Sequence, residues 1–245
     1  MPSRPPGSAS ERRDSARTSV VWHALGPVLD GPPLDVLDIG GGTGGFAVRV
    51  AQLGHRVTVV DPSPDALAAL SRRAVELGVD VAGRQGELGS LADLVGDGSA
   101  DVVLCHGVLE VVDDPAAALA ELARVLRAGG RLSLLAAQRH AAVVARAMAG
   151  HIAQAHALLD DPLAGSRPGR PFRRFSSEEL ATLVGDAGFT VGSVHGVRVF
   201  ADLVPGALLE LETGTTAALL ALEQAVATRS EYLPLATQLH LLATR

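Results

Sequence analysis

One stretch of the sequence decides the fold: Val36-Leu37-Asp38-Ile39-Gly40-Gly41-Gly42-Thr43-Gly44-Gly45. In it an apolar run contains one acid and then breaks into glycines. We interpret it as a buried strand, a tight turn and the first turn of a helix. Glycine allows positive φ and lets a ligand lie against the main chain. The stretch therefore predicts a loop that binds a nucleotide-containing cofactor.

Two classes of cofactor fit these glycines. Gly40, Gly42 and Gly45 satisfy G-x-G-x-x-G, and Asp61 ends the next predicted strand, where a dinucleotide-binding domain places an acid for the ribose. Asp38 favours the other class, because a carboxylate beside the loop repels a pyrophosphate. S-adenosylmethionine has no phosphate and carries a cationic ammonium and sulfonium, which an acid attracts. The alternative for Asp38 is a helix cap or a turn acid.

Composition restricts the other possibilities. The 245 residues are 47% hydrophobic, which is ample for one core, and the net charge of −6 argues against a general nucleic-acid binder. All 21 basic residues are arginine, so lysine chemistry is excluded. A single cysteine, Cys105, rules out an intramolecular disulfide and a multi-cysteine metal site. We expect a cytoplasmic protein with no metal and no membrane contact.

Strand and helix patterns alternate along the chain. Strands are expected at 36–39, 55–60, a short segment after 79, 100–105, 131–137, 189–200 and 235–243. Helices are expected at 17–29, from the glycine loop to 53, and at 64–77, 115–128, 140–159, 177–186 and 215–228. This alternation predicts an α/β fold with a doubly wound, Rossmann-like sheet. We expect disorder at 1–14, a single domain over 15–245, and a helical and loop lid at about 138–177.

The segments DVVLCHGVLEVVDDP and ARVLRAGGRLSLL, together with D-x-G-x-G-x-G around the loop, resemble the class I S-adenosylmethionine-dependent methyltransferases. HGVLE, HGVRVF, LLELET, YLPL and HLLATR are more narrowly similar to the bacterial tRNA carboxymethoxyuridine methyltransferases. The resemblance implies a seven-stranded sheet whose last strand is antiparallel and lies beside strand five. It also implies S-adenosylmethionine as cofactor, held by residues that fall here on Arg17, Gly40, Gly41, Asp61, Gly86, Glu87 and His106. The glycine loop itself adds Asp38, Gly42 and Gly44 to the predicted cofactor site.

The methyl acceptor is open between a tRNA carboxylate and a small metabolite. Methyl transfer from a sulfonium is an in-line displacement that mainly needs alignment, so a base is optional. His106 is the best-placed base for a hydroxyl or amine, and Arg198 is the candidate anchor for a carboxylate, with a surface salt bridge as its alternative. Arg167, Arg170, Arg173 and Arg174 lie in one acid-free loop that either grips RNA phosphates or is simply solvated.

Several alternatives remain from the residues alone. Asp61 is interpreted as a ribose ligand, because Ser63 can supply the cap of the next helix. Glu87 is either an adenine ligand or an acid favoured at a helix start. Trp22 is expected to pack into the scaffold rather than stack on substrate, and Cys105 to be a core residue. A dinucleotide oxidoreductase and a catalytically silent S-adenosylmethionine-binding module are the other function classes.

Overall fold

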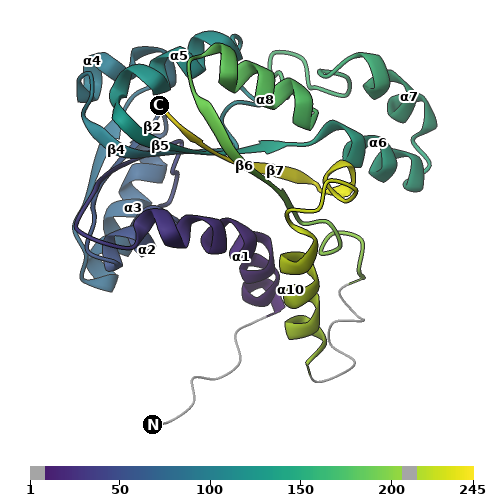
Figure 1. Ribbon diagram of the computed structural model, residues 1–245, viewed down its shortest axis with the longest axis horizontal. Helices are drawn as coiled ribbons and strands as arrows, with labels where there is room; N and C mark the ends of the chain where they lie inside the picture. Colours follow the sequence, from purple (N-terminus) through teal and green to yellow (C-terminus); the bar gives the residue numbers. More distant parts are fainter. Residues whose placement is uncertain (1–8, 206–213) are drawn as a thin grey trace.

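The computed structural model describes residues 9–205 and 214–245, with side chains from Thr18 onward. Its centre is a seven-stranded sheet in the order β3-β2-β1-β4-β5-β7-β6 (Figure 1). The strands are β1 (Asp35–Ile39), β2 (Arg56–Asp61), β3 (Val81–Gln85), β4 (Ala100–His106), β5 (Leu126–Ala137), β6 (Thr190–Val197) and β7 (Gln238–Thr244). Strands β1 to β5 pair in parallel, and β7 is antiparallel to both β5 and β6. The predicted doubly wound sheet, with its antiparallel last strand beside β5, is confirmed.

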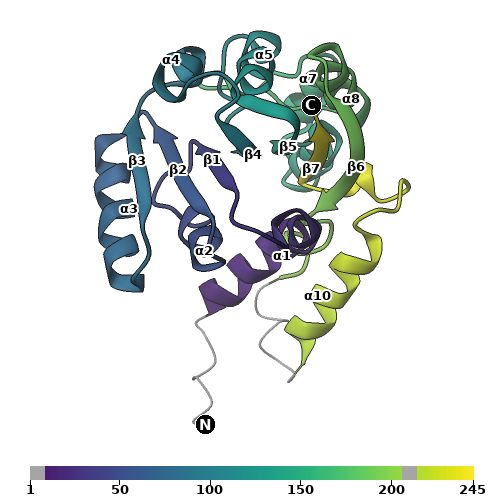
Figure 2. The ribbon, with the colours of Figure 1, turned by 60° about the vertical axis from the view of Figure 1, so that its left-hand side comes forward.

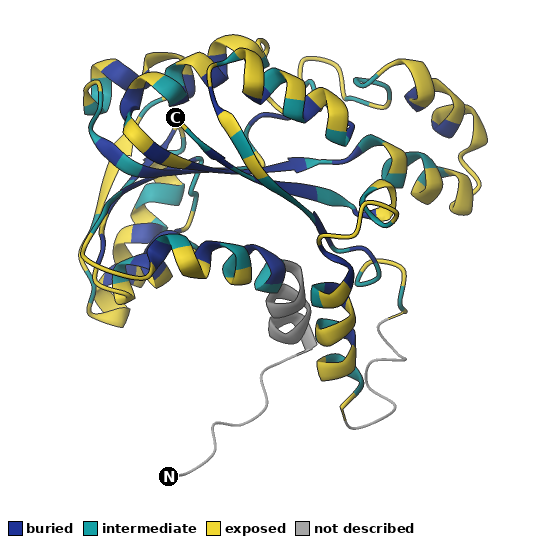
Figure 3. Cartoon of the chain, in the orientation of Figure 1, coloured by how far each residue is buried: buried dark blue, intermediate teal, exposed yellow. Residues whose placement is uncertain are grey.

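Helices cover both faces of the sheet (Figure 2). One core joins that sheet to α1 (Ala9–Leu29), α2 (Ala47–Gln52) and α3 (Pro64–Leu77). The other lies under α4 (Leu91–Val95), α5 (Pro115–Val125) and α8 (Ser177–Asp186). The remaining helices are α6 (Arg139–Met148), α7 (Ile152–Asp160) and α10 (Thr215–Val226), with 3-10 turns at Leu88–Ser90 and Leu233–Leu235. Figure 3 shows buried residues concentrated on the strands, whereas α6 and α7 are mostly exposed.

Local capping signals explain where several helices begin. The Ser63 hydroxyl accepts a hydrogen bond from the backbone N–H of Ala66 at the start of α3, as predicted. Ser176 and Glu179 form a reciprocal capping box at α8. Asp114 caps α5, whose first residue is a proline. These caps place the helix starts at the same end of the sheet as the carboxyl ends of the parallel strands.

Several boundaries differ from the sequence prediction. The helix expected over 140–159 is divided into α6 and α7 at Gly150, whose φ of +79° is incompatible with a continuous right-handed helix. Strand β5 begins at Leu126, ahead of the expected 131. Helix α1 begins at Ala9, inside the segment expected to be disordered up to residue 14; residues 1–8 of that segment lie outside the described residues. The lid expected at 138–177 contains α6, α7 and a loop, and its motion stays a prediction.

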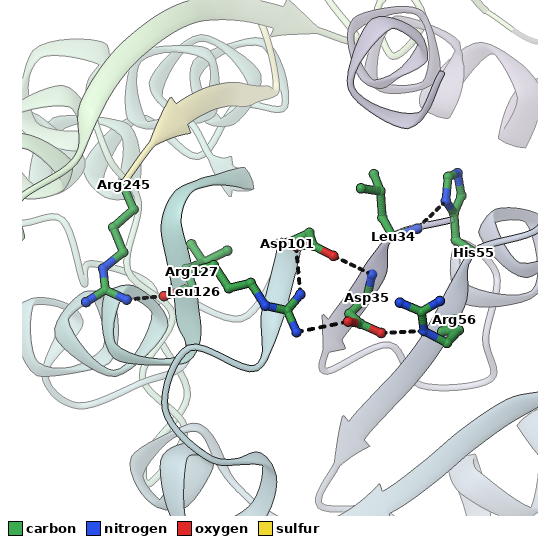
Figure 4. A network of polar contacts seen from close by, with 8 residues as sticks. All are labelled: Leu34, Asp35, His55, Arg56, Asp101, Leu126, Arg127 and Arg245. Carbon is green, nitrogen blue, oxygen red and sulfur yellow. Dashed lines mark hydrogen bonds and ion pairs between the residues drawn. The ribbon is translucent and has the colours of Figure 1, made fainter. Parts of the chain in front are cut away.

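Ion pairs join the amino ends of the parallel strands, away from the glycine loop (Figure 4). Asp35 of β1 pairs with Arg56 of β2 at 2.6 Å and with Arg127 at 2.9 Å. Arg127 also pairs with Asp101 of β4 at 2.7 Å, and the Asp101 carboxylate accepts the Asp35 backbone N–H. The Arg56 and Arg127 guanidiniums hold the pKa of Asp35 below its ordinary value against the effect of burial. We assign this network to holding strand register, which leaves the opposite edge for chemistry.

Candidate functional site

The glycine loop follows β1 at the carboxyl edge of the sheet. Gly40, Gly42 and Gly44 have φ of +65°, +54° and +79°, which other residues rarely adopt. The Gly40 N–H donates to the Val60 carbonyl at 2.8 Å, so the loop is attached to the end of β2. The predicted strand, turn and helix are present, with α2 starting at Ala47.

Asp38 lies beneath this loop with only 3% of its surface exposed. Burial, and secondarily the nearby Asp61 carboxylate, raise its pKa to about 7, against a hydrogen bond from the Ala47 backbone that lowers it. This hydrogen bond agrees with the alternative role of Asp38 as a helix cap, because it satisfies the backbone N–H of the first residue of α2. The Oδ2 atom is buried without a hydrogen-bond partner among the described residues. A buried acid with one oxygen unsatisfied can receive a cationic group of a ligand.

Asp61 connects the second strand to the same loop. Its Oδ2 accepts from the Gly42 N–H at 2.9 Å, and its Oδ1 accepts from the Ser63 N–H at 2.8 Å. Ser63, not Asp61, caps α3 through its side chain. The Asp61 carboxylate is therefore fixed at the carboxyl end of β2, against the loop on which a ligand would lie.

A pocket of about 750 Å³ opens beside the glycine loop. Its lining includes Gly40, Pro62, Gly86, Glu87 and Asp113, so it spans the ends of β1, β2 and β3 and the start of α5. The volume lies within the range of sites for cofactor-sized molecules. Two predicted cofactor residues, Gly86 and Glu87, thus meet the glycine loop in one cavity.

His106 ends β4 and lies against an aromatic pair, outside the lining of that pocket. Its ring meets Phe46 edge-on, with centroids 4.8 Å apart, and Phe46 stacks on Trp22 of α1 at 4.8 Å. The Arg49 guanidinium lies over the Trp22 ring, with its Cζ 4.1 Å from the ring centroid. Trp22 packs on the scaffold, as expected. Burial lowers the pKa of His106 to about 4, so the imidazole is neutral at pH 7.

Two further predicted residues, Arg198 and Cys105, lie outside the lining of that pocket. Arg198 follows β6 with φ of +61° and forms an ion pair with Asp202, which is the alternative that the sequence left open. The side chain of Arg17 lies outside the described residues, as does the LLELET segment up to residue 213. Cys105 is fully buried, and burial raises the pKa of its thiol above the ordinary range, consistent with a core residue.

Sequence reasoning missed four buried polar residues near this edge. Glu110 accepts the Ala137 N–H at 2.7 Å, and burial raises its pKa to about 7. Glu223 accepts three backbone N–H groups after β6. Ser133 forms one hydrogen bond with His240 and another with His106. One signal was an isolated polar residue inside an apolar run, as for Glu223 in TTAALLALEQAV. Glu110 and His240 also stand in the HGVLE and HLLATR segments that carry the family resemblance.

Within residues 9–205 and 214–245, no three His, Cys, Asp or Glu side chains are grouped as a metal ion would require. No described helix is both long and apolar enough to cross a bilayer.

Known proteins are similar to this chain in sequence and in fold. Residues 37–134 match the methyltransferase domain family. The tRNA 5-carboxymethoxyuridine methyltransferase of Escherichia coli K12 is 32% identical over 211 residues, covering 80% of each chain. A ubiquinone biosynthesis O-methyltransferase of Xanthomonas oryzae pv. oryzae is 36% identical over 138 residues, covering 52% of this chain and 56% of its own.

Solved structures share the fold at low sequence identity. An S-adenosylmethionine-dependent methyltransferase from Mesorhizobium loti superposes with a TM-score of 0.64 at 18% identity, covering 95% of this chain and 100% of its own. The magnesium protoporphyrin IX methyltransferase of Synechocystis PCC 6803, solved with bound S-adenosylhomocysteine, has a TM-score of 0.61 at 18% identity and covers 100% and 90%.

The fold, the glycine loop and these relatives define an S-adenosylmethionine-dependent methyltransferase. The chain belongs to the methyltransferase family that includes the Escherichia coli tRNA 5-carboxymethoxyuridine methyltransferase. Its cofactor is S-adenosylmethionine. The described residues fit that group, because an unsatisfied buried carboxylate and a cofactor-sized pocket flank a glycine loop.

Proposed function

We propose that this enzyme methylates the carboxylate of a carboxymethoxyuridine in tRNA. The observation that carries the proposal is the Escherichia coli relative, whose similarity covers 80% of both chains rather than the cofactor motifs alone. The chemistry is compatible, because an ionised carboxylate needs no base and His106 is held neutral. The cofactor supplies an electrophilic methyl group, and the chain's part is to align the acceptor with it.

In this proposal, each acid around the loop binds a different part of the cofactor. Asp38 faces the ammonium and sulfonium end, because its buried oxygen lacks a partner among the described residues. Asp61 accepts the ribose hydroxyls, and Glu87, in the pocket lining, accepts the adenine amino group. Gly40, Gly41, Gly42, Gly44 and Gly86 let the cofactor lie against the backbone.

Cofactor affinity should rise with pH through the titration of Asp38. Burial raises the pKa of Asp38 from 3.8 to about 7. Protonated Asp38 therefore stabilises the folded, cofactor-free protein at acidic pH, and this stabilisation is lost as the pH rises from 3.8 to about 7. The cofactor's positive charge favours the ionised acid. Binding should therefore strengthen roughly tenfold for each pH unit between about 5.5 and 7 and then level off.

Titration calorimetry from pH 5.5 to 8 measures this dependence. Asp38→Asn should bind weakly at every pH and lose the slope. Glu110→Gln is the matched control, because burial also raises the pKa of Glu110 to about 7 without placing it under the loop. An Asp38→Asn variant that kept the slope would contradict the assignment.

Asp61→Ala should weaken cofactor binding by about 1.5–3 kcal/mol, the size of a lost charged hydrogen bond. Asp61→Asn, which keeps one oxygen for the Gly42 N–H, should lose less. A cofactor analogue without the ribose 2′-hydroxyl separates the ribose contact from support of the loop. The wild type should discriminate against the analogue, and Asp61→Ala should not. Equal discrimination by both would show that Asp61 only braces the loop.

The acceptor side of the proposal involves His106 and Arg198. Because His106 is neutral, kcat at saturating S-adenosylmethionine should show no ionisation near pH 6.5, and His106→Ala should lose positioning rather than base catalysis. Arg198 remains the proposed carboxylate anchor. Its guanidinium is paired with Asp202, so the acceptor must displace or share that partner.

Arg167 and Arg170 should contribute to tRNA binding, because both are exposed at a turn between α7 and α8. Arg173 and Arg174 are half-buried, and Arg174 stacks on Phe172 at 5.0 Å, so we assign those two to the loop's own structure. Replacing Arg167 and Arg170 by alanine should weaken tRNA binding and reduce the slope of log K against log salt by about 1.5–2.

The control for that experiment is a double substitution of Arg72 and Arg73, which are exposed on α3. It removes the same charge from a different surface and should leave the salt slope unchanged. Cofactor affinity should be unaffected in both variants. Equal slopes for the two double variants would show that the loop is not part of the RNA surface.

The acceptor itself is tested by supplying labelled S-adenosylmethionine with tRNA from cells that lack this enzyme. Label on the carboxymethoxyuridine nucleoside supports the proposal. The second candidate is a methyltransferase of small metabolites, which the similarity to the ubiquinone O-methyltransferase favours. Label entering only a small-molecule extract, with none in tRNA, would replace the first candidate by the second.

A further inference from the structure

Three histidines form a row across adjacent strands at the carboxyl edge of β4. In the sheet register His106 of β4 is opposite Leu135 of β5, Leu135 is opposite His240 of β7, and His240 is opposite His195 of β6. Leu135 belongs to the core that α1 and α2 cover, so the row faces that side of the sheet. The rings of His240 and His195 stack with centroids 5.4 Å apart.

Ser133 bridges two of these rings from the middle strand. Its Oγ lies 2.8 Å from Nε2 of His106 and 2.8 Å from Nε2 of His240. Ser133 and His240 are both fully buried, which excludes water as a competing partner. The Nδ1 atoms of His106 and His240 are buried too and have no hydrogen-bond partner within the described part of the chain.

This geometry couples the protons of the two rings. A serine hydroxyl has one proton to donate and can accept another hydrogen bond. Its proton therefore points to one Nε2, which must be bare, while the other Nε2 must carry a proton and donate to Oγ. Burial lowers the pKa of both rings, that of His240 also through the neighbouring His106 and His195, so both are neutral at pH 7. The two rings must then be opposite tautomers.

We propose that Ser133 and His240 are positioning residues, which fix the ring orientation and tautomer of His106 at the methyl-transfer site. The inference rests on the place of His106 in the proposed function. A carboxylate acceptor needs a donor, so the order is His240 Nε2–H to Ser133 Oγ, and Ser133 O–H to His106 Nε2. That order leaves the proton of His106 on Nδ1, where it can donate to an anionic oxygen. A hydroxyl or amine acceptor would require the reverse order, with Nδ1 bare.

The tautomers are observable by long-range ¹H–¹⁵N correlation spectra of histidine-labelled protein at pH 7, with S-adenosylhomocysteine as the added ligand. We expect His106 protonated on Nδ1 and His240 protonated on Nε2. Opposite tautomers in the reverse order would support the coupling of the two rings through Ser133 but contradict a carboxylate acceptor. Two rings of the same tautomer, or a cationic ring, would overturn that coupling whatever the acceptor is.

Paired variants test the same point in the enzyme's kinetics. Ser133→Ala and His240→Leu should lower kcat about tenfold or more, leave the KM for S-adenosylmethionine unchanged, and give tautomer exchange at His106. Ser133→Thr keeps the hydroxyl, and His240→Gln keeps a nitrogen near the Nε2 position, so either should restore most of kcat and the single tautomer. Melting and cofactor titration identify a variant that is merely misfolded. Ser133→Ala and His240→Leu with unchanged kcat and an unchanged His106 spectrum would overturn the proposal.

Discussion

Gly41→Ala should weaken S-adenosylmethionine binding by about tenfold or more, whereas Gly45→Ala should bind as the wild type does. A Cβ at Gly41 would lie 2.6 Å from Oδ2 and 2.7 Å from Cγ of Asp38, closer than real Cβ atoms approach such groups. The buried acid or the loop must move, and either movement displaces a group that we assign to the cofactor. A Cβ at Gly45 meets nothing within 4 Å, and its φ is not in the left-handed region.

The two variants form a matched pair, since each adds one methyl group to the same loop. Calorimetric titration with S-adenosylmethionine, alongside thermal unfolding without ligand, separates an effect on binding from an effect on folding. A Gly41→Ala protein with full affinity for S-adenosylmethionine would mean that the position of Asp38 does not determine how tightly the cofactor binds. A Gly45→Ala protein as impaired as Gly41→Ala would mean that the loop tolerates no added atom anywhere.

Glu223→Leu should lower the free energy of unfolding by about 3–5 kcal/mol, which is a large fraction of the stability of an ordinary domain. Glu223 is 0% exposed, and its carboxylate accepts from the backbone N–H groups of Val199, Phe200 and Ala201 at 3.0, 2.8 and 2.7 Å. These residues follow the left-handed Arg198, so α10 holds the chain where it turns away from β6. Leucine would leave the three buried donors without their acceptor.

Chemical denaturation measures that loss. Glu223→Gln keeps one side-chain oxygen and should lose less than Glu223→Leu, which separates the hydrogen bonds from packing. Glu76→Ala, at an exposed position on α3, is the control for removal of a glutamate and should change stability little. If Glu223→Leu were as stable as the wild type, the three hydrogen bonds would contribute nothing to folding.

Most of the fold could be predicted because its signals are local. The caps at Ser63 and Ser176 and the glycines after β1 each act within a few residues, and the alternation of strand and helix then leaves few topologies. Gly150 was a weaker signal, because a glycine inside an apolar helical pattern is often tolerated; only its φ of +79° shows the break. The place of β7 between β5 and β6 came from family resemblance rather than from local pattern.

Local signals also placed two residues of the candidate site, although their roles toward the cofactor stay predictions. Asp38 and Asp61 could be placed because each lies at the carboxyl end of a strand next to a turn. The bridge from His106 through Ser133 to His240 joins positions 27 and 107 residues apart, and no local pattern reports such contacts. The ion pair of Arg198 with Asp202 could be predicted, because the acid lies four residues later in the sequence. Nothing in the sequence indicated that Arg198 would adopt a positive φ.

The central proposal is tested most directly by the chemical lability of the methyl group that the enzyme transfers. A carboxylate acceptor yields a methyl ester, which mild alkali hydrolyses to volatile methanol, whereas methyl groups on nitrogen or on an ether oxygen survive. The purified enzyme would be incubated with methyl-labelled S-adenosylmethionine and tRNA from cells that lack it. The tRNA would then be isolated and treated with alkali. We expect label in the tRNA and its release as methanol. Alkali-stable label in tRNA, or no label in tRNA at all, would contradict the proposed reaction.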